Sequence, residues 1–453
     1  MPEFLTLVPP PAALEMLLRH LSASKPAAEL IHSVNALGRV TAGDICAPHP
    51  LPMFSRSAVD GYAIHAGDTF GASESLPTYL QVVGEIPMGA EPSFALEPEK
   101  AAIIHTGGML PKGADSVVML ENTQTVSVDH RDCRACGASE IVNEASARTM
   151  VNIEVFKAVA EGENVIREGE DVSVGQVVIP AGTRLRPAEI GGLMALGITE
   201  LPVTVRPKVG ILSSGDEVVP PDHEPHPGQV RDVNSYSLSA LVTQTGGEPV
   251  RYGIIPDQAG ALKASAARAL LETDLVMITA GSSASVRDLT AEVIRLLGAP
   301  GLLVHGVNVR PGKPTILAVC DGKAVIGLPG NPVSALVVAG MFVVPVIERL
   351  LGLKATRPRP LVIARLTINV PSQAGREDWI AVKLIPYDDS LGKALTKVRG
   401  DVERSKGQVA YAAEPVFAKS NLIFSLAAAD GLVRVPTEAT GLSSGEVVEV
   451  FLL

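Results

Sequence analysis

The chain contains little cysteine, few aromatic residues and no excess of basic charge. Its 4 cysteines in 453 residues do not make a disulfide framework, so we expect a reducing, cytoplasmic location. Aromatic residues make up only 4% of the chain, which argues against surfaces that stack nucleic-acid bases. The net charge of −11 argues against a general binder of nucleic acids or membrane surfaces, so we expect neither among the partners.

The opening residues and the common nucleotide-binding motifs narrow the class further. The opening residues, MPEFLTLVPPPAALEML, contain no basic segment followed by a continuous apolar one, so we expect no signal peptide. The most apolar run, residues 335–347, is too short to span a bilayer and predicts a buried helix. The chain has neither a GxxxxGKS/T loop nor a dinucleotide fingerprint, which argues against a Walker-type site and against NAD.

What the chain does contain is enough apolar sequence for about three domains. Hydrophobic residues make up 46% of it and charged residues 19%, which excludes disorder over the full length. Residues 12–21 have helical spacing, and residues 175–185, GQVVIPAGTRL, predict a hairpin. Residues 51–150 hold short apolar runs between prolines and glycines, which predicts an all-β module. Because these runs are too few and too short to bury a large core alone, we expect the module to pack against a second chain.

Residues 207–350 alternate strands and helices, which predicts a doubly wound parallel sheet with helices on both faces. The expected strands lie in 208–214, 248–255, 274–281, 315–319 and 324–328, and the expected helices cover about 234–245, 259–272, 288–297 and 332–350. Beyond the linker KATRPRP, short alternating segments predict a small β-barrel or sandwich. The fold class is therefore α/β plus all-β in several domains.

Polar residues follow the expected strands at their carboxyl ends, where open parallel sheets bind ligands. Gly215, Asp216 and Glu217 follow one strand, Asp257 follows the next, and Asp288 opens a helix after a serine-rich loop. Several carboxylates at one edge repel one another unless a cation joins them, and hard oxygen ligands suit Mg²⁺. Arg310 and Lys313 suit a phosphate. Each residue alone also has an ordinary alternative, since Asp216 could serve its turn and Asp288 could cap its helix.

The stretch AVIGLPGNPVSALVVAG (324–340) places two prolines where a strand passes into a helix. Pro332 suits the first helical position, Asn331 suits the N-cap and Gly330 permits a sharp turn. These residues predict a rigid helix N-terminus with free N–H groups, which is a favourable place for an anion. The alternative is a well-built strand-to-helix turn without a ligand.

Seven motifs occur in order along nearly the whole chain. They are SAVDGYA (57–63), TGGMLPKGADSVV (106–118), GENVIREGEDV (162–172), SSGDEVV (213–219), RPGKP (310–314), GLPGNPVSA (327–335) and LAAADGLVRVP (426–436). With them the chain resembles the molybdopterin molybdenumtransferase family, to which bacterial MoeA and the C-terminal part of gephyrin belong. The resemblance implies a four-part architecture. Its parts are an N-terminal linker and dimer domain (1–50 and 151–186), an inserted β module (51–150), a molybdopterin-binding α/β domain (187–352) and a C-terminal β-barrel (357–453).

The same resemblance implies an activity in molybdenum cofactor biosynthesis. Adenylyl-molybdopterin and molybdate bind with Mg²⁺, AMP leaves, and molybdenum is set on the dithiolene. The family is homodimeric, and the molybdopterin adenylyltransferase is a candidate partner. Three alternatives stay open: adenylylation of molybdopterin, a molybdopterin-binding scaffold or sensor without turnover, and insertion of tungstate instead of molybdate.

By resemblance, specific residues of this chain acquire roles. The catalytic carboxylates are Asp60, Asp171, Glu217, Asp257 and Asp288, of which the last three hold the metal. In the homodimer, Asp60, Thr106 and Asp171 of one chain approach the α/β site of the other; alone, Asp60-Gly61 predicts a type I′ turn. Substrate binding falls to Thr106, Ser214, Gly215, Asp216, Asp232, Asn234, Gly281, Ser282, Ser283, Arg310, Lys313, Pro329, Gly330, Asn331, Ser334 and Ser420.

Two segments depart from the family pattern. The loop TAGSSASVRD (279–288) has Ala280 and Ser285 where the family usually has glycine, and hydroxyl groups there can still donate to phosphate. The segment 125–150 is longer than usual and contains His130, Cys133 and Cys136. These three are one ligand short of a structural zinc site, although Asp129 or Asp132 could add a fourth, and we expect an exposed loop without stoichiometric zinc.

Overall fold

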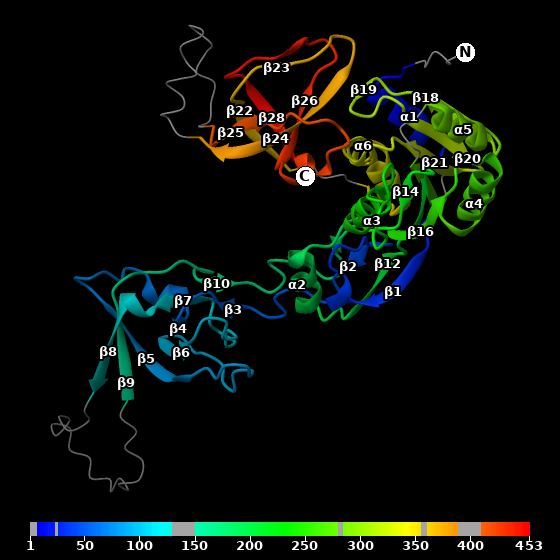
Figure 1. Cartoon of the computed structure of the whole chain (residues 1–453). Coiled ribbons are helices and arrows are strands. Elements are labelled where there is room, and N and C mark those ends of the chain that lie inside the picture. The colour runs from blue at the N-terminus through cyan, green and yellow to red at the C-terminus, as the bar shows by residue number, and fades with distance from the viewer. Residues whose placement is uncertain (1–6, 23–25, 129–149, 280–283, 355–359, 388–408) are drawn as a thin grey trace, which may run out of the picture. The chain divides into compact units, whose positions relative to one another are not determined.

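The computed structural model describes residues 7–22, 26–128, 150–279, 284–354, 360–387 and 409–453. The chain divides into two compact units, and it passes between them four times (Figure 1). Unit 1 comprises residues 1–43, 181–186 and 200–453, and unit 2 comprises residues 44–180 and 187–199. The Cys133 and Cys136 segment lies outside the described residues, so the prediction about zinc stays a prediction.

Unit 1 is built on a six-stranded sheet in the order β16-β13-β17-β21-β20-β18. The strands are β13 (Lys208–Ser214), β16 (Glu248–Ile255), β17 (Leu275–Thr279), β18 (Pro300–His305), β20 (Ile316–Cys320) and β21 (Lys323–Leu328). The first four in this order are parallel, as predicted. The prediction for residues 315–319 was wrong in direction, because β20 runs antiparallel to β21 and to β18. Asp321 and Gly322 both have positive φ, the conformation of a tight two-residue hairpin, and so short a connection cannot make a parallel crossover.

Helices cover both faces of this sheet, as predicted (Figure 1). Residues of α1 (Pro10–His20), α3 (Asn234–Thr245) and α6 (Pro332–Leu350) form one buried cluster with one face of the sheet. Residues of α4 (Ala259–Glu272) and α5 (Ala284–Arg295) form a second cluster with the other face. Alternate strand residues such as Val276 and Met277 belong to opposite clusters, as the two-residue period of a strand requires. Helix α5 begins at Ala284, so the prediction that Asp288 opens this helix was wrong.

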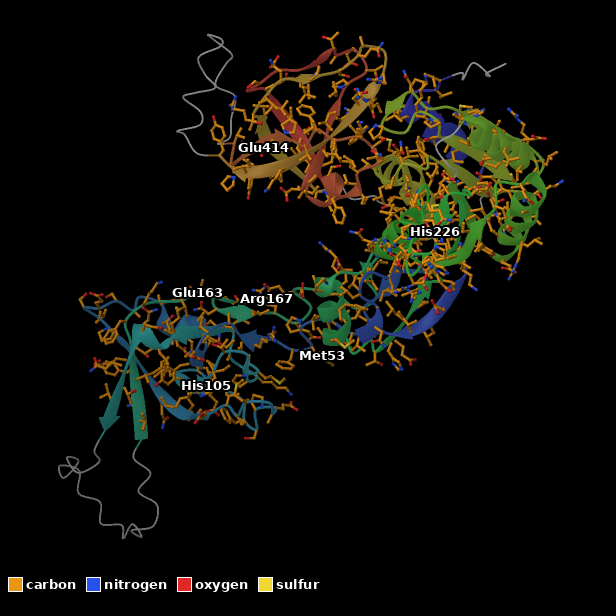
Figure 2. The ribbon with its side chains drawn as sticks, in the orientation of Figure 1. Met53, His105, Glu163, Arg167, His226 and Glu414 are labelled. Carbon is orange, nitrogen blue, oxygen red and sulfur yellow. The ribbon has the colours of Figure 1, made fainter. Side chains whose placement is uncertain are left out.

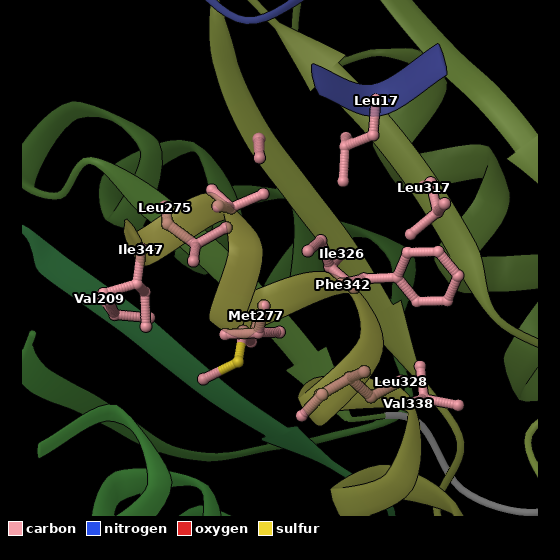
Figure 3. Close-up of a cluster of buried hydrophobic side chains, with 14 of the residues drawn as sticks. Leu17, Val209, Leu275, Met277, Leu317, Ile326, Leu328, Val338, Phe342 and Ile347 are labelled. Carbon is pink, nitrogen blue, oxygen red and sulfur yellow. The ribbon is translucent and has the colours of Figure 1, made fainter. Parts of the chain in front are cut away.

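Helix α6 is the central element of the first cluster (Figure 3). It runs over 19 residues, so its length and apolar composition alone would allow it to cross a membrane, contrary to the expectation from residues 335–347. However, 56% of its most apolar window is buried inside the structure. Phe342 has no exposed surface and lies in one cluster with Leu317 and Ile326 of the sheet. The helix is therefore the core helix of unit 1, as predicted.

The C-terminal part of unit 1 is a closed five-stranded barrel, in agreement with the expected all-β domain. Its strands follow the order β24 (Glu377–Pro386), β25 (Tyr411–Pro415), β22 (Leu361–Leu366), β28 (Val447–Leu452) and β26 (Gly431–Val435), and β26 pairs back onto β24. Short strand pairs complete the unit: β1 (Ala28–His32) with β12 (Glu200–Thr204), β14 (Val218–Val219) with β15 (Val230–Arg231), and β23 (Val370–Pro371) with β27 (Gly441–Leu442). The two-residue strand β19 (Val309–Arg310) pairs with β24 and so joins the loop after β18 to the barrel.

Unit 2 contains the expected all-β module as a six-stranded sheet. Its order is β7 (Ser116–Met119), β4 (Gly61–Ile64), β6 (Lys100–Ile104), β5 (Thr78–Glu85), β9 (Met150–Val155) and β8 (Thr123–Val128). The module buries one apolar cluster around Tyr62 and Leu80 and another around Ala63 and Ile86. The short strands therefore bury a small apolar cluster on each face of the sheet, and the contact of this module with a second chain stays a prediction.

The remaining elements of unit 2 are small. They are β2 (Ile45–Cys46) with β11 (Val177–Ile179), β3 (Arg56–Ser57) with β10 (Val165–Ile166), and α2 (Pro187–Ala195). The predicted hairpin over residues 175–185 was wrong, because Val177–Ile179 pairs with Ile45–Cys46 instead of with the residues that follow it. The two strands lie far apart in the sequence, so no local pattern predicts that they pair.

We expect Phe342→Ala to lower the free energy of unfolding by about 3–5 kcal/mol, because it leaves a large cavity in a closed core. Urea unfolding followed by fluorescence would measure the change, since the only tryptophan, Trp379, packs against this cluster. Phe424→Ala is the control: Phe424 is 85% exposed and its removal should cost less than about 0.5 kcal/mol. Equal effects of the two substitutions would contradict the assignment of α6 as the core helix.

Candidate functional site

The carboxyl ends of five strands meet at one edge of the unit 1 sheet, here called the carboxyl edge. Strands β16, β13, β17 and β21 are parallel and end there together. Strand β18 is separated from β21 by the antiparallel β20, so it runs in the same direction as β21 and ends at the same edge. Arg310 and Lys313 follow β18 in the sequence, beyond the carboxyl end of this strand. Two cavities open there.

The first pocket has a volume of about 540 Å³ and a lining rich in oxygen atoms. Its polar lining residues are Ser213, Ser214, Glu217, Arg231, Asp232, Asn234, Thr279, Asn331 and Asn421. Five of the predicted site residues with polar side chains are thus brought together here, from β13, the loop after it, the start of α3 and the turn before α6. This lining combines hydroxyl, carboxylate and amide groups.

Hydrogen bonds fix the loop that follows β13. The Ser214 hydroxyl donates to Asp257 Oδ1 at 2.6 Å, and the Asp257 amide N–H donates to Asp216 Oδ1 at 3.2 Å. Gly215 has a φ of +153°, and a Cβ there would lie 2.8 Å from a methyl group of Val218. A glycine is therefore required at this position. Glu217 of this loop lines the pocket, while hydrogen bonds link Asp257 to Ser214 and to Asp216.

Asn234 is the first residue of helix α3 and Asp232 lies two residues before it, and both are more than nine-tenths buried. Asp232 Oδ1 accepts the Ser235 N–H at 3.1 Å, so it caps the helix as well as lining the pocket. Asn234 Nδ2 donates to the Gly330 carbonyl at 2.8 Å, which ties α3 to the turn before α6. The oxygen of the same side-chain amide, Asn234 Oδ1, is buried without a hydrogen-bond partner among the described residues. A ligand donor in the pocket would satisfy it.

The second pocket, of about 890 Å³, lies between the α/β part of unit 1 and the barrel. Four cationic residues line it, namely Arg310, Lys313, Arg376 and Lys419, and no aspartate or glutamate belongs to its described lining. Among the predicted residues, Arg310, Lys313, Pro329, Gly330, Asn331, Ser334 and Ser420 meet here. A cavity with this charge suits an oxyanion.

A buried carboxylate orients two of these cations. Asp378 has no exposed surface and accepts two hydrogen bonds from the Arg376 guanidinium, at 2.6 and 3.1 Å. Ser372 Oγ donates to it at 2.9 Å, and Arg310 Nη1 lies 3.8 Å from it. The pairing of β19 with β24 sets Arg310 opposite Asp378 in register. Both guanidinium groups are thereby held at the pocket wall.

The turn Pro329-Gly330-Asn331-Pro332 stands between the two pockets, and Gly330 and Asn331 line both. Asn331 occupies the N-cap position of α6, but its side chain makes no capping bond; instead its Nδ2 donates to Ser420 Oγ at 2.9 Å. The Val333 N–H donates to the Ser420 carbonyl at 3.1 Å. The prediction of a fully bare helix N-terminus was therefore wrong, because Ser420 of the barrel takes one of the amide groups that were expected to be free.

Unit 2 holds the remaining predicted residues. Asp60 Oδ1 accepts the Thr106 N–H at 2.7 Å and the Thr106 hydroxyl at 3.0 Å. His105, labelled in Figure 2, lies with Nδ1 3.9 Å from Asp60 and with Nε2 3.1 Å from Glu85. Among the described residues, no hydrogen bond joins the exposed Asp171 carboxylate to this group. The structure therefore brings Asp60 and Thr106 together but not Asp171.

Asp60 precedes β4, and the glycine after it has a steric function. A Cβ at Gly61 would lie 1.9 Å from the Val118 carbonyl oxygen, so only glycine lets β4 and β7 approach this closely. Neither Asp60 nor Gly61 has the positive φ that a type I′ turn requires, so that interpretation was wrong. The dipeptide places a carboxylate at the end of a closely packed strand.

Some predicted residues stay untested and some lining residues were missed. Gly281, Ser282 and Ser283 lie outside the described residues, as does the side chain of Asp288, whose backbone is in the second turn of α5. Sequence reasoning missed Arg231, Asn421, Arg376, Trp379 and Lys419. The sequence GREDW (375–379) carried a weak signal for Arg376, since it gathers three charges at the start of a strand. No local sequence pattern indicated that Lys419 would line a pocket.

The donor set at the carboxyl edge fits Mg²⁺ if a ligand supplies further oxygens. Mg²⁺ in proteins often takes one or two carboxylates and completes its octahedron with water and substrate phosphate. Glu217 and Asp257 offer two carboxylates on one loop cluster. No group of three or more histidine, cysteine, aspartate or glutamate side chains in the described part of the chain could hold a metal ion. A magnesium ion here would therefore depend on the phosphate oxygens of its ligand.

Three family models match successive parts of the chain. They are "MoeA N-terminal region (domain I and II)" over residues 8–197, "Probable molybdopterin binding domain" over 210–349 and "MoeA C-terminal region (domain IV)" over 364–453. A molybdopterin molybdenumtransferase of Nostoc sp. is 32% identical over 431 residues, which cover 94% of this chain and 88% of the relative. One from Bacillus subtilis is 30% identical and covers 92% and 88%. The crystal structure of a molybdopterin biosynthesis MoeA protein from Pyrococcus horikoshii OT3 is similar over 99% of this chain and 100% of that one, with 31% identity and a TM-score of 0.77.

The hydrogen bonds from Thr106 hold the pKa of the Asp60 carboxyl below its usual value, with the backbone N–H as the larger cause. We expect Thr106→Ala to raise this pKa only part of the way back, because the backbone bond survives. The stabilisation from these bonds is present above the usual carboxyl pKa and is lost as the pH falls through the lowered one. A carboxyl NMR titration, assigned by comparison with Asp60→Asn, measures the shift. A complete return to the usual value in Thr106→Ala would show that the backbone bond contributes nothing.

Proposed function

Because the chain belongs to the MoeA family of molybdopterin molybdenumtransferases, we propose that it inserts molybdenum into molybdopterin in molybdenum cofactor biosynthesis. Adenylyl-molybdopterin and molybdate are its substrates, and AMP and molybdenum-loaded molybdopterin are its products. The observation that carries the proposal is the pair of adjoining pockets. One is lined by hydroxyl, carboxylate and amide groups with a single cation, Arg231, and the other by four cations and no carboxylate among the described residues.

The two pockets divide the substrates between them. The first pocket receives the adenylate end of adenylyl-molybdopterin, where Ser214 and Asn234 bind it. Glu217 of the lining, Asp257 beside Ser214, and Asp288 would hold Mg²⁺, which would offset phosphate charge as AMP leaves. Asp232 supports this pocket by fixing the start of α3.

The second pocket receives the molybdate dianion. Arg310, Lys313 and Arg376 supply positive charge, while Ser334 and Ser420 supply hydroxyl donors. The wall at Gly330-Asn331 keeps the oxyanion beside the adenylate. Proximity of two anionic reactants is unfavourable in water, so fixed cations at this place favour their encounter. The serine-rich loop with Gly281, Ser282 and Ser283 completes the donors to the substrate.

The active assembly is a homodimer in which Asp60, Thr106 and Asp171 of one chain approach the pockets of the other. Support comes from Asp60, whose carboxylate is held in a defined position by Thr106 yet lies more than half exposed. Within each chain we assign residues 1–50 with 151–186, 51–150, 187–352 and 357–453 to the four parts named above. The cytoplasm is its location, where the molybdopterin adenylyltransferase is a candidate partner.

Molybdate-dependent release of AMP tests the proposal. Purified protein is incubated with adenylyl-molybdopterin, Mg²⁺ and molybdate, and AMP is quantified with and without the oxyanion. We expect AMP only when molybdate is present. Consumption of ATP without molybdate would indicate adenylylation of molybdopterin instead. Absence of both reactions would indicate a scaffold or sensor without turnover. AMP release that depends more strongly on tungstate than on molybdate would show that tungsten is the inserted metal.

Asp257→Asn should reduce AMP release by about 10²-fold or more while the melting temperature stays unchanged. The amide oxygen can still accept the hydrogen bond from Ser214, so the loop keeps its geometry while one hard anionic ligand is lost. Asp274→Asn is the matched control, because Asp274 accepts a backbone bond from Lys208 at the opposite edge of the same sheet. Wild-type turnover of Asp257→Asn at limiting Mg²⁺ would remove this residue from the mechanism.

Light scattering at micromolar concentration should give about twice the chain mass of 47.2 kDa. The expectation follows from the contribution of Asp60 to a neighbouring chain, which a monomer cannot make. If the protein is a monomer at concentrations that support full AMP release, the contribution across chains is wrong. The assignment of the two pockets of unit 1 would then still stand.

A further inference from the structure

The second pocket contains a cation that the proposed reaction has not used. Lys419 comes from the barrel loop before α8 (Ile423–Ala427) and lines the pocket with Arg310 and Lys313. Its ammonium group has no hydrogen bond or ion pair within the described part of the chain, and the residue is exposed. We propose that Lys419 is a further oxyanion-binding residue, which adds to Arg376 and Ser420 of the barrel a cation that no carboxylate of the described residues balances. The inference rests on the proposed function.

The backbone of Lys419 is held in place at the pocket. The next residue, Ser420, accepts the Val333 N–H at its carbonyl and the Asn331 amide at its hydroxyl. The carbonyl of Lys419 itself accepts the Leu422 N–H at 3.0 Å. These bonds anchor the loop to the first turn of α6. Lys419 is therefore held at the pocket lining, next to the segment that contacts the positive end of the α6 dipole.

The two arginines of the pocket differ from Lys419 because a neighbouring carboxylate balances part of their positive charge. Arg376 is paired with the buried Asp378, and Arg310 lies near the same carboxylate, so part of their charge is already balanced. Lys313 and Lys419 have no such carboxylate among the described residues. Two uncompensated positive charges match the charge of a dianion, and these two lysines supply them, one from the α/β part and one from the barrel.

Equilibrium dialysis with molybdate alone tests the proposal without the pterin substrate. We expect Lys419→Met to raise the Kd for molybdate about threefold to tenfold, and Lys419→Arg to restore most of the affinity. Lys383→Met is the control, because Lys383 is an exposed lysine of β24 that lines neither pocket. The difference between wild type and Lys419→Met should shrink as NaCl is raised, which a loss of structure alone would not produce.

The single tryptophan reports where the ion binds, since Trp379 lines the second pocket. Molybdate should change its fluorescence in wild type, and inorganic phosphate titrated in parallel shows whether another oxyanion uses the same charge. An unchanged molybdate affinity in Lys419→Met, or bound molybdate that leaves Trp379 fluorescence unaffected, overturns the inference. Either result leaves the AMP-release assay as an independent test of the transferase function. If the wild-type protein shows no molybdate-dependent AMP release, the proposed transferase function is wrong as well.

Discussion

The structure around both pockets depends on how strand β21 passes into helix α6. Pro332 begins the helix without an N–H group, and Gly330 and Asn331 form the only stretch that lines both cavities among the described residues. Three hydrogen bonds hold this turn: Asn234 binds the Gly330 carbonyl, and Ser420 receives bonds from Asn331 and Val333. Helix α3, helix α6 and the barrel are thus positioned against one four-residue segment. Because α6 is also the core helix, the hydrophobic core fixes the turn from behind.

Charge is sorted across this turn instead of being mixed. All the carboxylates among the described lining residues, Glu217 and Asp232, belong to one cavity together with Arg231, and four of the five lining cations belong to the other. The buried Asp378 would be unfavourable alone, but Arg376 donates two hydrogen bonds to it and Ser372 a third. The same carboxylate then holds Arg376 in one orientation. A buried ion pair of this kind serves orientation more than stability, because its desolvation offsets much of its Coulomb energy.

Local patterns predicted most of unit 1. The bounds of β13, β16, α3, α4 and α6 follow from apolar periodicity and from flanking prolines and glycines, which act within a few residues. The predictions that failed depend on partners distant in sequence or on an overlooked turn. Val177–Ile179 pairs with Ile45–Cys46, and the Val333 N–H finds Ser420, and neither contact leaves a local trace. Asp321-Gly322 did signal the hairpin that reverses β20. Glu217, Asn234 and Arg310 were predictable because strand ends converge, whereas Lys419 depends on how the barrel packs on α6.

Helix α1 lies on the same face of the sheet as α6, although it comes at the start of the chain. Its buried residues, Ala13 and Leu17, pack in one cluster with Leu317 and Phe342, about 300 residues later. During synthesis at 5–20 residues per second, the helix emerges from the ribosome roughly 15–60 s before that partner surface exists. All of unit 2 is made in the interval. The apolar stripe of α1 therefore remains exposed, or covered by a chaperone, while unit 2 is made, so α1 reaches its native contacts late although it is translated before unit 2.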